Sequence, residues 1–229
     1  MPATPLLQDI SACVFDAYGT LFDVGSVARG AQEELGDRWQ ALSDLWRGKQ
    51  LQYTWLRGLS GQHADFWQVT GEALSFAMAS LGLADPGLHQ RLMDLYLRIS
   101  AYSEVPATLA GLQAKGVRLA ILSNGTPAML AAAVANAGLG SRFEALLSVE
   151  EVGVFKPHPR VYHLASQRLN LPMGQLCFLS ANGWDAWSAK ACGMKVLWCN
   201  RTGQMPERLP AAPDGELRDL SGLPGAIGY

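Results

Sequence analysis

An aspartate at the end of an apolar segment is the first residue of this sequence with a clear chemical use. The segment is Ser11-Ala-Cys-Val-Phe-Asp16-Ala-Tyr-Gly-Thr20. Such a run predicts a buried strand whose last residue emerges at the carboxyl edge of a sheet, where α/β proteins place ligands. Gly19 allows the backbone to turn there, and the Thr20 hydroxyl can hydrogen-bond the carboxylate. Asp16 is therefore a candidate nucleophile.

Polar residues also follow three later apolar segments. Because parallel strands end at the same edge of a sheet, we expect these side chains to meet Asp16. A polar pair after one strand could equally cap a helix, so the positions are informative only together. They are Ser123 and Asn124 after 117–124, Lys156 after 145–149, and Ser180, Asn182 and Asp185 after 176–180.

The elements that must position these residues follow from the periodicity of the chain. From residue 105 onward, helical patterns at 106–115, 127–137, 160–169 and 184–192 alternate with apolar strands at 117–124, 145–149, 176–180 and 195–199. This alternation predicts an α/β fold with a Rossmann-like parallel sheet. We expect the tail, rich in Pro and Gly from residue 202, to be a loop.

Between the first strand and residue 100 the pattern is helical, with helices expected at about 39–56, 65–82 and 86–100. This block is predicted to be an insertion. We therefore expect a Rossmann-like core domain formed by residues 1–21 and 101–229, and a helical cap domain formed by residues 22–100.

Composition limits the partners. The 229 residues are 49% hydrophobic, enough for a sizeable core, and the net charge of -2 supplies no basic surface for nucleic acid or membrane. The four cysteines have no metal-type spacing and are expected to be reduced. The chain shows neither a leader-like amino terminus nor an apolar run of about 18 residues, so we expect a cytoplasmic protein with a small-molecule partner.

The motif Asp-x-Tyr-Gly-Thr-Leu resembles the first motif of the haloacid dehalogenase superfamily, in which the aspartate attacks substrate and becomes an ester. The later polar positions match the other motifs of the superfamily in order. Superfamily phosphatases carry a second aspartate two residues on, as general acid, and acidic residues in the fourth motif that hold Mg²⁺. Here those positions are Tyr18, Ser180 and Asn182. Since halide leaves without protonation, this variant suits cleavage of a carbon–halogen bond, with no metal and no cofactor.

Five segments together resemble the L-2-haloacid dehalogenases. Besides the first motif they are Leu45-Trp-Arg47-Gly-Lys-Gln-Leu-Gln-Tyr-Thr-Trp-Leu, Ser123-Asn124-Gly, Phe155-Lys-Pro-x-Pro-x-Val-Tyr162 and Ser180-x-Asn-x-Trp-Asp185. The resemblance implies hydrolysis of short L-2-haloalkanoic acids to D-2-hydroxy acids through an aspartyl ester. It also implies a homodimer.

The resemblance further implies a role for each matching residue. Asp16 displaces halide at C2, and Thr20 holds its carboxylate. Arg47, Asn124 and Trp184 surround the departing halide, while Ser123 and backbone N–H groups near Tyr18 receive the substrate carboxylate. Lys156 steadies Asp16 and pairs with Asp185. Asn182 and Asp185 position the hydrolytic water, supported by Ser180 and Tyr162. The substrate-binding wall comprises Ala17, Tyr18, Leu51, Phe66 and Trp184.

Two other functions stay open from the sequence. One is a superfamily phosphatase acting on a small phosphate ester, and the other is a catalytically idle member that binds a small carboxylate or a partner protein. Gly48 departs from the family pattern, where a larger polar residue is expected, and this glycine could alter the volume of the pocket.

Overall fold

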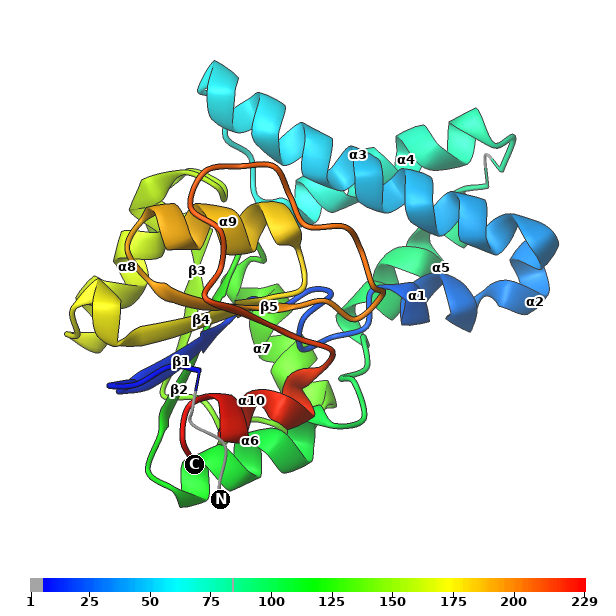
Figure 1. Ribbon diagram of the computed structural model, residues 1–229. Coiled ribbons are helices and arrows are strands. Elements are labelled where there is room, and N and C mark those ends of the chain that lie inside the picture. Colours follow the sequence, from blue (N-terminus) through cyan, green and yellow to red (C-terminus); the bar gives the residue numbers. More distant parts are fainter. Residues whose placement is uncertain (1–5, 84) are drawn as a thin grey trace.

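The computed structural model of the protein describes residues 6–83 and 85–229. Within them, the centre is a six-stranded parallel sheet in the order β3-β2-β1-β4-β5-β6 (Figure 1). The strands are β1 (Ala12–Phe15), β2 (Arg118–Ser123), β3 (Ala145–Ser148), β4 (Leu176–Ser180), β5 (Lys195–Cys199) and β6 (Gly215–Leu217). Because β1 pairs with both β2 and β4, the residue that follows Phe15 lies between two other strand ends. The predicted Rossmann-like fold is confirmed.

Helices cover both faces of the sheet. In Figure 1, α8 (Pro159–Leu169) and α9 (Gly183–Ala191) lie on one face, whereas α6 (Val105–Ala114), α7 (Pro127–Asn136) and α10 (Leu223–Ala226) lie on the other. All residues of β1 and β4 are buried as a result. A strand covered on both faces is apolar throughout, which is why the sequence shows continuous apolar runs there.

In the described residues, five α-helices and a turn of 3₁₀-helix (Gly36–Arg38) lie between β1 and α6. The α-helices are α1 (Gly25–Gly30), α2 (Gln32–Leu35), α3 (Trp39–Ser60), α4 (Phe66–Ser80) and α5 (Pro86–Leu97), and α3 and α4 run side by side above the end of the sheet (Figure 1). Gly61 ends α3 in the left-handed conformation at φ 66°. The Asp65 carboxylate then caps α4 by accepting from Gln68 N at 2.8 Å.

The two chain segments that connect this helical group to the sheet lie side by side. Asp23 N donates to Ser100 O at 2.9 Å, and Tyr102 N donates to Leu21 O at 3.0 Å. A group of helices that leaves and rejoins the sheet at one place is typical of an inserted domain. We therefore propose the division into a core (1–21 and 101–229) and a cap (22–100); residues 1–5 lie outside the described residues.

The prediction that the tail is a loop is wrong in part. Strand β6 joins the sheet beside β5, and a turn of 3₁₀-helix (Leu220–Gly222) leads into α10. The strand has three residues, of which only Leu217 is buried, so periodicity could not reveal it. Strand β6 is stabilised by its pairing with β5. None of the helices in the described part of the chain is long and apolar enough to cross a bilayer.

Candidate active site

Asp16 lies at the carboxyl end of β1 and is 6% exposed. Thr20 Oγ1 and Asn182 Nδ2 donate to its Oδ2 at 3.0 and 2.9 Å, and Lys156 Nζ donates to its Oδ1 at 3.0 Å. Ser180 Oγ is 3.5 Å from Oδ2, at the outer limit of a hydrogen bond. Donors on both oxygens hold the carboxylate in one orientation while lone pairs remain for attack on an electrophile.

Lys156 links two carboxylates. Its ammonium is buried and lies 3.0 Å from Asp16 Oδ1 and 2.8 Å from Asp185 Oδ2. Burial acts to lower the pKa of this ammonium, but the two carboxylates outweigh burial and raise the pKa above its usual value. A cation that stays charged inside the protein can stabilise Asp16 throughout a reaction.

Asp185 lies behind Asp16 in the first turn of α9 and is fully buried. Burial raises the pKa of its carboxyl, and Lys156 opposes only part of this rise. Tyr162 OH, from α8, donates to Asp185 Oδ1 at 2.7 Å. Burial also raises the pKa of the Tyr162 hydroxyl, which therefore stays protonated as a donor. A carboxylate with a raised pKa is a better base than an exposed one.

The end of β2 supplies the next two predicted residues, and both are buried. Asn124 Oδ1 accepts from the backbone N–H of Lys156 at 3.0 Å, which fixes the loop after β3 against the loop after β2. Ser123 Oγ accepts from Gly125 N at 3.1 Å. These contacts orient both side chains toward the cavity at Asp16, which they line.

Arg47 reaches this edge from α3 of the cap. Its Nη2 donates to Tyr18 O at 3.3 Å and lies 3.5 Å from Asn182 Oδ1. Its Nη1 donates to Gln50 Oε1 at 2.7 Å. The guanidinium therefore joins the cap to two strand-end loops of the core. No carboxylate is among the partners found for Arg47 in the described residues, so its charge faces the cavity.

Gln50 is a residue of the site that sequence reasoning missed. It is 1% exposed, and its Nε2 donates to Thr70 Oγ1 at 2.7 Å and to Tyr96 OH at 3.2 Å. These bonds fix Gln50, which in turn fixes Arg47. The signal was available, because residues three apart on a helix are neighbours and Gln50 lies three residues after Arg47.

An apolar wall completes a small cavity above Asp16. Tyr18 and Phe66 have ring centroids 6.0 Å apart. The free volume is about 10 Å³, about the space of one water molecule. Cap and core are therefore closed on each other, and substrate requires them to part. The lining residues are Asp16, Tyr18, Arg47, Leu51, Phe66, Ser123, Asn124, Lys156, Asn182 and Trp184.

The remaining predicted residues do not line this cavity. Thr20, Ser180, Tyr162 and Asp185 lie behind it and act on residues that do. Ala17 is buried, and its carbonyl accepts from the backbone N–H groups of the turn after β1. Ala17 therefore stabilises the turn after β1.

Gly48 does not affect the cavity. It is exposed on α3, and a Cβ at this position would meet no atom within 4 Å. A larger residue there would project into solvent. An effect of Gly48 on the pocket volume, which the sequence left open, therefore has no support in the structure.

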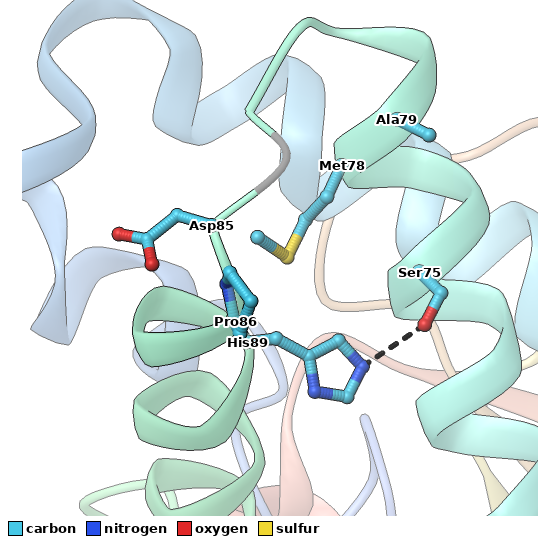
Figure 2. Close-up of a pocket in the computed structure, with 6 residues that line it drawn as sticks. All are labelled: Ser75, Met78, Ala79, Asp85, Pro86 and His89. Carbon is cyan, nitrogen blue, oxygen red and sulfur yellow. Dashed lines mark hydrogen bonds between the residues drawn. The ribbon is translucent and has the colours of Figure 1, made fainter.

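A second hollow, between α4 and α5 of the cap, contains a serine and a histidine (Figure 2). Ser75 Oγ and His89 Nε2 are 3.1 Å apart. The Asp85 carboxylate points away from His89 in Figure 2 and instead accepts from Gly87 N at 2.8 Å. Because no carboxylate among the residues drawn orients the imidazole, the pair lacks the third member of a nucleophile–base triad.

The described residues bring together no group of three or more His, Cys, Asp or Glu that could hold a metal ion. At the carboxyl edge of the sheet, Asp16 and Asp185 both contact Lys156. The ammonium thus lies between the two carboxylates.

Comparison with known proteins identifies the family. The model of the haloacid dehalogenase-like hydrolases matches residues 10–193. This chain therefore belongs to the haloacid dehalogenase-like hydrolase family and is an enzyme.

The finer resemblance, to L-2-haloacid dehalogenases, is also confirmed. The (S)-2-haloacid dehalogenase of Pseudomonas sp. (strain YL) is 46% identical over 92% of this chain and 91% of its own. A solved dehalogenase structure has a TM-score of 0.94 at 42% identity, covering 96% of this chain and 98% of the other. The L-2-haloacid dehalogenase from Xanthobacter autotrophicus, with chloropropionic acid covalently bound, has a TM-score of 0.88 at 39% identity, over 94% and 97%.

Proposed function

We propose that this enzyme hydrolyses short L-2-haloalkanoic acids to D-2-hydroxy acids through an ester on Asp16 and without a metal ion. The observation behind the proposal is that Asp16 is fixed by Lys156 and Asn182, with Tyr18 where a phosphatase has its general acid. Halide is a stable anion and needs no proton to leave, so this site has what the reaction requires. The substrates named for the relatives, 2-haloacids and chloropropionic acid, support the same reaction.

In the first step, an Asp16 oxygen attacks C2, and the electron pair of the carbon–halogen bond leaves with the halide. Arg47, Asn124 and Trp184 surround the halogen. Ser123 and backbone N–H groups near Tyr18 receive the substrate carboxylate. All of these residues line the cavity above Asp16, which supports the assignment. Groups aimed at the charge that develops on the halogen lower the barrier more than groups that bind the ground state.

In the second step, water attacks the carbonyl carbon of the Asp16 ester. Asn182 and Asp185 position and activate this water, and the water proton passes to Asp185 and then to the departing hydroxy acid. The bond to C2 stays intact in this step. Because C2 is inverted only once, an L-2-haloacid gives a D-2-hydroxy acid. Lys156, Tyr162 and Ser180 hold the two carboxylates in place.

A halide-release assay tests the proposal. The substrates are chloroacetate and the two enantiomers of 2-chloropropionate, each assayed before and after exhaustive EDTA treatment. We expect release from chloroacetate and from the S enantiomer alone, unchanged by EDTA, with D-lactate as the product on chiral chromatography.

Two companion measurements, of phosphate release and of ligand binding, separate the alternatives. Hydrolysis of a phosphate monoester that disappears with EDTA and returns with Mg²⁺ would identify a phosphatase. Binding of 2-chloropropionate without release of halide would identify an idle carboxylate-binding protein. Consumption of both enantiomers at equal rates would contradict the assigned positions of Ser123 and Arg47, which leave one face of C2 open to Asp16.

A further inference from the structure

One face of α3 extends beyond the candidate active site. Arg47 and Leu51 line the cavity above Asp16, whereas Trp55 and Leu59 line a separate groove. These four residues are spaced four apart, and helical residues with this spacing lie one above the other on the same face. The face that meets the reacting atoms therefore continues toward the carboxyl end of α3 and out to solvent.

The groove is large and apolar compared with the cavity. Its volume is about 440 Å³, within the range of 300 to 1,000 Å³ that is roughly typical of small-molecule sites. Leu59 is 87% exposed and Leu209 is 47% exposed, so the apolar surface reaches the outside of the protein. The lining residues are Thr54, Trp55, Gly58, Leu59, Val154, Phe155, Lys156, Pro157, His158, Trp184, Ser188 and Leu209.

The groove and the cavity share two lining residues. Lys156 and Trp184 line both. The Trp184 ring meets the Trp55 ring edge to face, with centroids 5.4 Å apart and an interplanar angle of 83°. Two indole rings thus stand at the boundary between the reactive cavity and the groove. Besides its apolar wall, the cavity is lined by the charged groups of Asp16, Arg47 and Lys156, whereas the groove is mainly apolar.

We propose that this groove binds the aliphatic chain of 2-haloalkanoic acids whose chain is too long for the cavity, with the pair Trp55 and Trp184 forming the passage. The inference rests on the proposed function. The closed cavity holds about one water molecule, so the side chains that surround the reacting atoms leave no space for a long chain at C2. A longer chain must extend out of the cavity. The groove is the adjacent apolar space, and Lys156 and Trp184 line both. An anionic head with an apolar tail matches this order of charged and apolar surface.

Gly58 offers a way to fill the groove without touching the reactive cavity. It lines the groove, and a Cβ placed on it would meet no atom within 4 Å. The Cβ of Gly58→Leu therefore meets no atom of the protein, and the rest of its isobutyl group extends into the groove that Gly58 lines. Gly48→Leu is the matched control, because this glycine lies on the same helix, is exposed and lines neither space. Both changes replace a glycine of α3 by leucine, a better helix former.

The kinetic test compares (S)-2-chloropropionate with 2-bromooctanoate. We expect Gly58→Leu to leave kcat/KM for chloropropionate close to wild type and to lower kcat/KM for bromooctanoate by about tenfold or more, mainly through KM. Gly48→Leu should change neither. Equal loss for both substrates in Gly58→Leu would mean that the groove is a common entrance, and no loss for either would mean that it is unused. Both results would overturn the proposal.

A binding measurement keeps this inference separate from the proposed function. In calorimetric titrations, octanoate should bind wild type more tightly than propionate, and Gly58→Leu should abolish that difference. Since neither ligand contains a halogen, this result does not depend on dehalogenation. Sedimentation of wild type and both variants addresses another occupant: a change of oligomeric state in Gly58→Leu alone would assign the groove to a second copy of the chain and overturn the proposal.

Discussion

The core and the cap contribute opposite kinds of surface to the same cavity. The core contributes a buried chain of charges, in which Lys156 lies between Asp16 and Asp185. The cap contributes one cation, Arg47, and otherwise apolar side chains, of which Leu51 and Phe66 line the cavity. In the core two carboxylates share one ammonium, whereas the charge of Arg47 is directed at whatever enters the cavity.

This difference suits the core to the chemical steps and the cap to the selection of substrate. Paired and buried groups keep their geometry, because removing one partner leaves the other charged and unsolvated. That constancy suits bond formation and ester hydrolysis. A cap that must part from the core to admit substrate can instead select the leaving group and the shape of the substrate. We therefore expect core substitutions to stop a chemical step and cap substitutions to change rate and selectivity.

The largest effect is expected at the nucleophile. Asp16→Asn should abolish halide release, by about 10⁴-fold or more, because an amide is a poor nucleophile. Ion chromatography of chloride from chloroacetate measures this directly. Single turnover of wild type in ¹⁸O-water provides the matching positive result, since label should enter Asp16 before it enters glycolate. Label in glycolate from the first turnover, with none in Asp16, would mean that water attacks C2 and that no ester forms.

The second core prediction separates the half-reactions. Asp185→Asn should release about one equivalent of halide and then stall, with steady turnover lowered by roughly 10² to 10⁴, the range for loss of a general base. Intact-protein mass spectrometry after mixing with chloroacetate should show a carboxymethyl adduct on the peptide containing Asp16. The burst should be slower than in wild type, because the change also removes a partner of Lys156. Full steady turnover without an adduct would exclude Asp185 from ester hydrolysis.

The third prediction tests the cap. Arg47→Ala should lower kcat by on the order of 10² to 10³, as expected for the loss of a donor aimed at developing charge. Arg47→Lys should be almost as damaging, because an ammonium cannot reproduce the planar guanidinium that contacts Tyr18 and Gln50. Halide release from bromoacetate and chloroacetate measures both variants. A near-normal kcat in Arg47→Ala would exclude the guanidinium from stabilising the halide.

The contrast between core and cap also explains which site residues could be predicted from the sequence. Asp16, Ser123 and Ser180 could be assigned because each ends an apolar strand, and parallel strands bring such ends together. Arg47 is on a helix, where a cation is by default a solvated surface charge. Only the motif around it pointed to the site.

Other features could not be predicted from local pattern. The short helices α1 and α2 have too few residues for helical periodicity, and β6 depends on pairing with β5. Gln50 could be found from its spacing to Arg47, but the bonds that fix it, to Thr70 and Tyr96, depend on the packing of α3, α4 and α5. The groove beyond Trp55 is formed by cap and core together, so no single segment reveals it.

The smallest effect is expected in the dependence of kcat on pH, which distinguishes a core residue from a cap residue. Burial raises the pKa of the Asp185 carboxyl, and the hydrogen bond from Tyr162 OH acts in the opposite direction. Tyr162→Phe removes this donor and should raise the pKa further. Because Asp185 acts as a base only when ionised, activity is lost as the pH falls through its pKa, and a higher pKa moves that acid limb to higher pH.

At pH values above the limb, Tyr162→Phe should lower kcat by about tenfold, as expected for a hydrogen bond to a charged group worth about 1.5 kcal/mol. Tyr96→Phe is the matched control, because it removes an equally buried hydroxyl that contacts Gln50 of the cap and not Asp185. This control should leave the acid limb in place while lowering kcat through Arg47. Profiles of kcat against pH for the two variants decide the matter: an acid limb that moves equally in both, or in neither, would mean that the limb does not report the ionisation of Asp185.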